Sequence, residues 1–454
     1  MTTTADPQAE TACARRRFLI VLGCIAAVAL VIRVWFATVV VPHTALGGDP
    51  HTYHLLGTNL ANGLGYVRPA EINLPAAALV PTAEFPPGLP AVIAVATKLG
   101  AQSPERQAVL TSLIGAGTVV LVALLARRLA GAAAGLVAAA IVAIHPLFFQ
   151  PDAILMSEGP YFFAVSAVLL AAFAVWDHAE QWWRWAVLGA LIGLGALVRP
   201  EALLFVPFLA LPIAIARRKA AWRVLGGFAV TCVVLAAVVG PWVVRNAVRF
   251  DAVVPIASNT GVVVLGSNCE QTYSGRDIGS WDFGCVAEVA GLDPAHSRIT
   301  RDGPDEVQVY DYWRSKGFEY ARAHLGSLPK VVPVRVLRTL GLWNPAAQLD
   351  FDVPEGRNRT AQAIGYGVHW VLLPFAVAGA IWGWRRRRGL TAILLVPIAV
   401  AVLDSAIFYG STKMRAAAEP SIAVLAAVGM MAAVAAVRAR RLPVSPGAER
   451  SERS

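Results

Sequence analysis

Charged residues are scarce in this sequence. They make up 15% of its 454 residues, whereas hydrophobic residues make up 57% and the mean hydropathy is +0.58. A soluble globular protein has about 25% charged residues and no repeated apolar runs of about twenty residues. This composition excludes an ordinary soluble enzyme and predicts an all-α polytopic membrane protein.

Several common motifs are absent as well. The sequence has no CxxC, HExxH, GxGxxG or GxxxxGK[ST] pattern, so thiol redox, zinc peptidase, dinucleotide-binding and P-loop functions have no support. The formal net charge of +10 does not indicate a nucleic-acid partner, because most of the arginines lie in short clusters between apolar runs. We therefore expect membrane lipid, and no nucleic acid, around this chain.

Cysteine is rare, with five in the chain. Cys13 lies in the N-terminal tail, and Cys24 and Cys232 lie in apolar runs, where a free cysteine behaves as a small core residue. Cys269 and Cys285 lie in one long polar segment that is expected outside the cell, where oxidation is allowed. We expect these two to form a disulfide.

The apolar runs predict about ten transmembrane helices. They cover residues 18–41, 108–126, 132–144, 154–175, 186–198, 202–216, 224–244, 364–384, 390–409 and 420–437. The expected organisation is a tail (1–17), seven spans (18–244) with an outer loop (42–107), an extracytoplasmic region (245–363), three spans (364–437) and a second tail (438–454). Residues 89–99, 310–324 and 327–343 are expected to form helices at or near the outer membrane surface.

Arginine clusters set the predicted orientation. In the ten-span arrangement, every basic cluster without compensating acids falls on one side, which is then the cytoplasmic side. These clusters are at residues 15–17, 127–128, 217–219, 385–388 and 438–441. Both termini are thus expected in the cytoplasm of a plasma-membrane protein. The first apolar run lacks a small-residue cleavage site, so we expect it to be retained.

A polar interval at residues 47–88 holds the strongest candidates for catalysis. Asp49 and Glu84 are its candidate bases, and Glu84 precedes the rigid turn Pro86-Pro87-Gly88. Within about one helical turn of Asp49 lie Tyr53, His51 and His54. The alternative is a solvated loop that contains ordinary turn residues.

Further ionisable residues map to the outer ends of the spans and are expected to converge with the two acids on one shallow cavity. They are Glu158, Arg199, Glu201, Arg245, Lys413 and Arg415. Several outer basic residues have acids close in sequence: Arg68 with Glu71, Arg199 with Glu201, and Lys413 and Arg415 with Glu419. Arg33 and Asp404 are expected about two turns deeper in the membrane. Three alternatives stay open for them: they pair with each other, they pair with charged residues of the cavity, or each forms a structural ion pair that locks two helices.

Six segments in order resemble one family over nearly the whole chain, Arg15 to about Arg441. They are GDPHTYHLLGTNLANGLGY, EFPPGLP, HP with ILMSEGPYF, GLGALVRPEALL, PWVVRNAVRFDAVVPIASNTG with GSN, and MRAAAEPSIAVLAA. Together they look like the polyprenyl-phosphate-sugar-dependent membrane glycosyltransferases, relatives of protein O-mannosyltransferases and lipid A aminoarabinose transferases. The resemblance implies the GT-C fold.

The resemblance also implies roles for individual residues. An essential acid ahead of a tyrosine in the first outer loop matches Asp49 with Tyr53, a second acid before a proline turn matches Glu84, and an acid at the outer start of the fourth span matches Glu158. The aminoarabinose branch has a lysine directly after the second acid, whereas this sequence has Phe85. That departure argues against lipid A as the acceptor.

The chemistry of such a transfer agrees with these residue types. A lipid-linked sugar phosphate needs cations at headgroup height, and Arg199, Arg245 and Arg415 are expected there with Lys413. Asp49 is the expected general base for an acceptor hydroxyl of a glycan, lipid or protein, and a one-step displacement would invert the anomeric carbon. Glu84 is expected to position the acceptor, hold a divalent cation or pair with an arginine; no other cofactor is implied.

Two other classes of function stay open at this point. A transporter or lipid flippase would place its site near the midplane on broken helices in matching halves. We find no inverted repeat, and the second, third, fourth, seventh and tenth predicted spans carry no midplane charge. A non-catalytic scaffold or receptor is the third class, in which the acids only orient loops.

Overall fold

The described part of this protein is built from helices. The structure is a computed structural model that describes residues 12–41, 47–68, 79–217, 221–299 and 303–441. Within these ranges the only β pairing is an isolated antiparallel bridge between Val67 and Pro81. The all-α class predicted from the apolar runs is confirmed.

Seven helices in the described part of the chain are long and apolar enough to cross a membrane. They are α1 (Ala12–Trp35) with the π-helical turn η1 (Phe36–Val40), α4 (Pro104–Ala130), α7 (Glu158–Asp177), α10 (Ala221–Phe250), α18 (Arg359–Arg386), α19 (Arg388–Ile407) and α20 (Glu419–Arg441). Two consecutive helices, α5 (Ala132–Ile144) and α6 (Pro146–Ala153), are bent by 50° and make an eighth span if counted together. The described residues thus contain seven or eight candidate spans, against about ten predicted for the chain.

The predicted spans at 186–198 and 202–216 account for the difference. α8 (Trp182–Ala196) has 15 residues, which gives a length of about 22 Å against a hydrocarbon core of about 30 Å. The chain then forms a 3-10 turn η3 (Pro200–Leu204), a π-helical turn η4 (Val206–Ala210) and the short helix α9 (Leu211–Ala216). Prolines at 200, 207 and 212 interrupt this segment, because proline cannot donate a backbone hydrogen bond.

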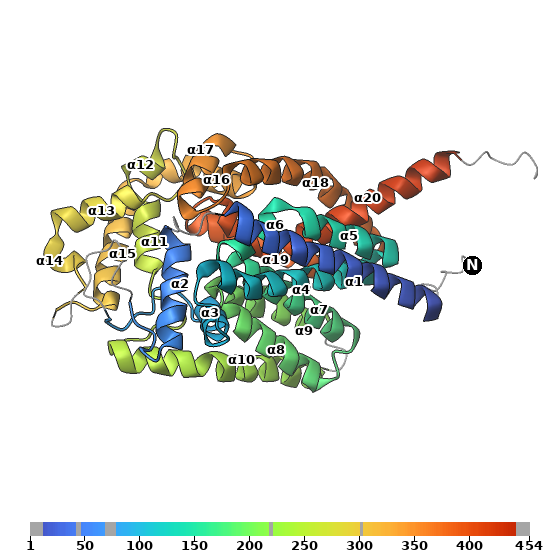
Figure 1. Cartoon of the computed structure of the whole chain (residues 1–454), viewed down its shortest axis with the longest axis horizontal. Coiled ribbons are helices and arrows are strands. Elements are labelled where there is room, and N and C mark those ends of the chain that lie inside the picture. The colour runs from blue at the N-terminus through green and yellow to red at the C-terminus, as the bar shows by residue number, and fades with distance from the viewer. Residues whose placement is uncertain (1–11, 42–46, 69–78, 218–220, 300–302, 442–454) are drawn as a thin grey trace, which may run out of the picture.

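The polar segments form a second group of helices. Those before α4 are α2 (Gly48–Ala61) and α3 (Gly88–Lys98). Those after α10 are α11 (Thr260–Ser267), α12 (Glu270–Tyr273), α13 (Phe283–Leu292), α14 (Pro294–Ser297), α15 (Glu306–Ala323), α16 (Leu328–Thr339) and α17 (Pro345–Asp352). Figure 1 shows α11 to α15 at one end of the long axis, and the start of α1 and the end of α20 at the other.

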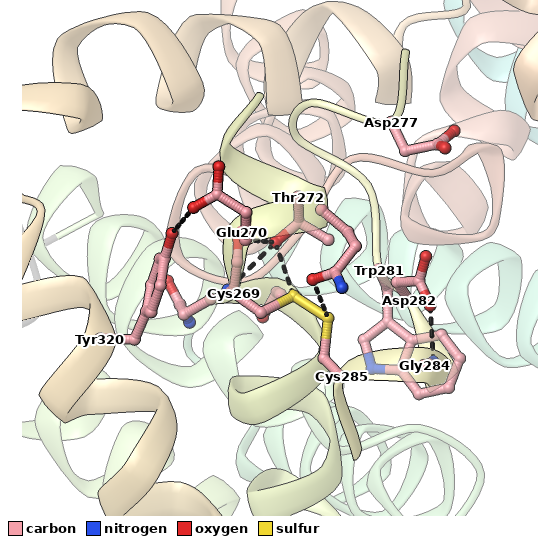
Figure 2. The surroundings of a disulfide bond; sticks show 12 residues. Cys269, Glu270, Thr272, Asp277, Trp281, Asp282, Gly284, Cys285 and Tyr320 are labelled. Carbon is pink, nitrogen blue, oxygen red and sulfur yellow. Dashed lines mark hydrogen bonds between the residues drawn. A yellow bond between two sulfur atoms is a disulfide. The ribbon is translucent and has the colours of Figure 1, made fainter. Parts of the chain in front are cut away.

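A disulfide ties together part of this outer group. Cys269, which precedes α12, is joined to Cys285 in α13, and both residues are buried. Beside them, the Tyr320 hydroxyl of α15 donates a hydrogen bond to the Glu270 carboxylate over 3.0 Å (Figure 2). These links connect α12, α13 and α15 into one unit.

Two glycines let α18 and α20 cross at close range. A Cβ added at Gly379 would lie 1.9 Å from the carbonyl oxygen of Leu425, and one added at Gly429 would lie 1.9 Å from that of Phe375. Small residues at a helix crossing allow such an approach of two backbones within a membrane. The crossing fixes α20, whose first residue, Glu419, belongs to the candidate site.

Arg33 forms a buried ion pair with Asp152 of α6, not with Asp404. Its Nε lies 2.9 Å from the Asp152 carboxylate, and both side chains are 1% exposed. Gly115 and Gly159 make room for that carboxylate, because a Cβ at either would come within 2.2 Å of it. The structural ion pair is therefore the correct alternative for Arg33.

Candidate active site

Asp49, Lys413 and Glu355 form the ionic centre of the candidate site. Asp49 lies in the first turn of α2, Lys413 in the 3-10 turn η8 (Thr412–Ala417), and Glu355 at the end of the 3-10 turn η7 (Val353–Glu355). The Lys413 ammonium lies 3.4 Å from the Asp49 carboxylate and also donates to the Glu355 carboxylate. The Asp49 side chain is 39% exposed and that of Lys413 is 8% exposed, so Asp49 is the open member of the group.

Local sequence explains how these three elements meet. Gly47, at the N-cap of α2, lies against the carbonyl oxygen of Pro354, where a Cβ would come to 3.3 Å. Gly356 ends η7 in the left-handed conformation at φ +87°. On the other side, the Ser411 hydroxyl accepts a hydrogen bond from the backbone N–H of Lys413 and caps η8.

The charges of this group are unequal. Burial raises the pKa of Glu355 to about 7; Lys413 opposes this rise, and the neighbouring Asp49 carboxylate adds to it. Burial alone would lower the pKa of Lys413, but Glu355 and Asp49 together hold it well above its ordinary range. At neutral pH Lys413 is therefore an ammonium, and the Glu355 carboxylate beside it is partly protonated.

A second buried pair lies next to this centre. Arg357 Nη2 donates to the Glu158 carboxylate of α7 over 2.8 Å, and the two side chains are 4% and 3% exposed. Glu158 was expected in the site, whereas sequence reasoning missed both Arg357 and Glu355. No local motif marks Arg357, since its partner is 199 positions away.

Three cations converge on one narrow pocket. Its ionisable lining residues are Glu158, Arg357, Lys413, Arg415 and Glu419. Arg415 Nε donates to Glu419 over 2.6 Å, as the sequence spacing predicted, and Arg415 Nη1 donates to the carbonyl oxygen of Thr339. Among the described residues, buried Arg357 Nε and Arg415 Nη2 have no hydrogen-bond partner. Both N–H groups can donate hydrogen bonds to an anionic ligand. Such a ligand would satisfy them, since a buried donor without an acceptor destabilises the folded protein.

Arg199 lies at the edge of this group. Its Nε donates to Glu201 over 2.5 Å, the predicted pair, and its Nη1 donates to the Ser157 hydroxyl, directly before Glu158. Asp404 interacts electrostatically with both Glu201 and Arg199. Arg33 pairs with Asp152 instead of Asp404, and a link from Asp404 to the cavity stays a prediction.

Glu84 makes its ion pair in a second network, with Arg68. Its carboxylate lies 2.9 Å from Arg68 Nη1, which is also 3.3 Å from Glu306 of α15. Burial raises the pKa of Glu84, and Arg68 opposes that effect. Glu71, the expected partner of Arg68, lies outside the described residues. Glu84 thus helps to attach the first outer loop to α15.

Arg245 is also in this second network. Its guanidinium donates over 2.7 Å to the carbonyl oxygens of both Thr82 and Tyr66, and it is not among the residues that line the narrow pocket. Tyr53 links the two networks, because its buried ring packs on Phe85 with centroids 4.8 Å apart. Burial raises the pKa of Tyr53, which keeps the phenol neutral.

Comparisons with known proteins give one family match and several similar folds. Residues 84–244 match the family model described as dolichyl-phosphate-mannose-protein mannosyltransferase. The fold resembles the oligosaccharyltransferase of Archaeoglobus fulgidus in its apo crystal structure, with 17% identity, a TM-score of 0.56, and 95% of this chain and 52% of that chain covered. A structure of the oligosaccharyltransferase AglB of that organism with an inhibitory peptide and a dolichol-phosphate gives 14% identity, a TM-score of 0.54 and the same coverage.

A third structure, of the Archaeoglobus fulgidus oligosaccharyltransferase with zinc and sulfate, gives 15% identity, a TM-score of 0.50, and coverage of 92% of this chain and 50% of that chain. This chain spans about half the length of these oligosaccharyltransferases. None of the curated proteins matches the sequence. The likeness confirms the GT-C fold that the sequence segments implied, and the match over residues 84–244 agrees with the predicted family resemblance.

Proposed function

We propose that this protein is an integral membrane glycosyltransferase. It transfers a sugar from a polyprenyl-phosphate donor to a hydroxyl group of an acceptor on the extracytoplasmic face. The observation that carries the proposal is an exposed carboxylate, Asp49, beside a pocket lined by Lys413, Arg357 and Arg415. The fold supports it, since AglB, which has this fold, is described in complex with a dolichol-phosphate.

Asp49 is proposed as the general base. As the acceptor oxygen forms its bond to the anomeric carbon, its proton passes to the Asp49 carboxylate, a contribution of about 10²- to 10⁴-fold. Asp49 suits this role because it is the exposed acid of the ionic centre. Attack from the side opposite the leaving group inverts the anomeric carbon.

The cations are proposed to receive the leaving group. When the bond between the anomeric carbon and the phosphate oxygen breaks, its electron pair stays on the prenyl phosphate, and guanidinium groups stabilise that charge. Arg357 and Arg415 carry the unpartnered buried donors of the pocket. Arg357 thereby joins Arg415 and Lys413 as a proposed phosphate-binding residue.

The other predicted residues receive different proposed roles. Arg199 and Tyr53 are proposed to border the donor, because they reach Ser157 and the start of α7. Glu84, together with Arg68 and Glu306, is proposed to position the outer loop. Its effect on turnover is then indirect, as is that of Arg245.

Location and orientation are part of the proposal. We place the protein in the plasma membrane with both termini in the cytoplasm, so that residues 245–363 and the Asp49 loop face outward. The acceptor is then an extracytoplasmic glycan, lipid or protein. A donor lipid embedded in the outer leaflet presents its phosphate at the height of such a pocket.

The direct test is transfer by the purified protein. Detergent-solubilised enzyme is mixed with radiolabelled prenyl-phosphate sugars and cell-envelope acceptors, and transfer of the label is measured. Activity that depends on a lipid-phosphate donor is the expected result. Arg357→Ala is the test variant and should lower transfer, and its matched control is Arg314→Ala, which removes an exposed arginine of α15. A folded protein that binds the donor but transfers no sugar would instead favour a transporter or scaffold.

A further inference from the structure

The Lys413 ammonium occupies the position between the carboxylates of the ionic centre. Its partners come from two other elements: Asp49 from α2 at 3.4 Å, and Glu355 from η7. The ammonium also lies 5.8 Å from the centre of the Phe351 ring. One oxygen of each carboxylate, Asp49 Oδ2 and Glu355 Oε1, therefore faces a cation that belongs to the chain.

These residues do not fit a resident divalent cation. Within the described ranges, no group of three or more His, Cys, Asp or Glu side chains is placed to hold a metal ion. A divalent ion between Asp49 and Glu355 would also lie next to the Lys413 ammonium. Two neighbouring positive charges repel each other strongly in a buried site. Asp49 and Glu355 raise the pKa of Lys413 although burial opposes them, which keeps the ammonium charged.

The Lys413 ammonium can bridge the two carboxylates and a ligand, as a metal ion would. It has three N–H donors, and two of them serve Asp49 and Glu355. The third is available to a ligand oxygen, because Lys413 also lines the narrow pocket with Arg357 and Arg415. Lys413 thus connects the proposed base to the proposed phosphate pocket.

We propose that Lys413 is the resident cation of this site and takes the place of a divalent metal ion. Besides binding the donor phosphate, it holds the Asp49 carboxylate in place. Sugar transfer then needs no divalent cation. The statement about transfer rests on the proposed function, whereas the statement about metal binding does not.

The first test uses the wild-type protein. Manganese binding is measured by electron paramagnetic resonance on purified protein, and sugar transfer is measured with and without EDTA. We expect no stoichiometric Mn²⁺ binding and less than a twofold change in transfer on chelation. Stoichiometric binding that Asp49→Asn abolishes, or a loss of transfer that Mn²⁺ or Mg²⁺ restores, would overturn the proposal.

The second test removes the ammonium. Lys413→Ala leaves Asp49 and Glu355 facing each other, so we expect it to gain Mn²⁺ binding, which the double variant Lys413→Ala/Asp49→Asn then loses. Transfer by Lys413→Ala should fall at least tenfold, and Mn²⁺ should restore part of it. Lys316→Ala, an exposed lysine of α15, is the control and should change neither property. Folded Lys413→Ala that binds no more Mn²⁺ than wild type would contradict the assignment.

These measurements separate the two proposals. If no donor supports transfer, the proposed function fails, but the Mn²⁺ measurements on wild type and Lys413→Ala still decide whether Lys413 replaces a metal. Lys413→Arg adds a further check, since it keeps a single positive charge. It should stay insensitive to EDTA, and a requirement for metal in this variant would count against the proposal.

Discussion

Arg357→Ala should affect stability and donor binding by two separable mechanisms. In the native protein Arg357 and Glu158 are 4% and 3% exposed and 2.8 Å apart. Removal of the arginine leaves Glu158 buried without its partner, a change that costs about 3–5 kcal/mol in comparable buried pairs. It also removes a guanidinium from the pocket lined by Lys413 and Arg415, so donor affinity should fall as well.

A double variant distinguishes these effects. Arg357→Met/Glu158→Gln removes both charges and keeps similar volumes, so most of the lost free energy of unfolding should return. Donor affinity should stay low, because the phosphate still lacks the guanidinium. Denaturant unfolding and binding of a radiolabelled donor are measured on the same samples, with Arg314→Ala as an exposed control expected to lose less than about 1 kcal/mol. Full recovery of donor affinity in the double variant would refute a role of Arg357 in phosphate binding.

Three further predictions concern packing, pH and orientation. Gly115→Ala places a Cβ 1.9 Å from the Asp152 carboxylate and should lower the free energy of unfolding by about 1–3 kcal/mol or more, whereas Gly367→Ala, with open space around it, should be neutral or stabilising in the same unfolding assay. Glu355 loses its proton as the pH rises through about 7 and then draws Lys413 away from the phosphate. Donor affinity, measured by binding of a radiolabelled donor, should therefore decrease above pH 7 in wild type and stay constant in Glu355→Gln. The same decrease in Glu355→Gln as in wild type would argue against this coupling. A cysteine introduced at Gly303 should react with an impermeant reagent applied outside intact cells and one at Arg387 should not, and the opposite labelling would invert the orientation.

The fold was largely predictable because membrane helices leave a strong signal in sequence. Runs of apolar residues gave the positions of helices such as α4 and α7, since a span needs about twenty such residues. The two short segments around Pro200 show the limit of that signal. Hydropathy does not reveal where prolines divide an apolar run into short pieces, here a 3-10 turn, a π-helical turn and α9.

The site was predictable in part. Asp49, Glu158 and Lys413 were expected at the outer ends of spans, and the structure brings them together. Glu355 and Arg357 could not be found in this way, because they follow a polar segment without periodicity and pair with residues far away in the chain. Glu84 was expected beside Asp49, but Arg68 and Glu306, distant in sequence from each other, determine its partners.

The central claim is that Asp49 acts as the base and the cations bind the donor. Donor binding and single-turnover transfer are measured on purified wild type, Asp49→Asn and the control Asp311→Asn, which alters an exposed acid of α15. Asp49→Asn should transfer sugar at least about 100-fold more slowly while it binds the donor within about twofold of wild type, and Asp311→Asn should match wild type in both. Equal losses of donor binding and transfer in Asp49→Asn, or full transfer activity in that variant, would contradict the account.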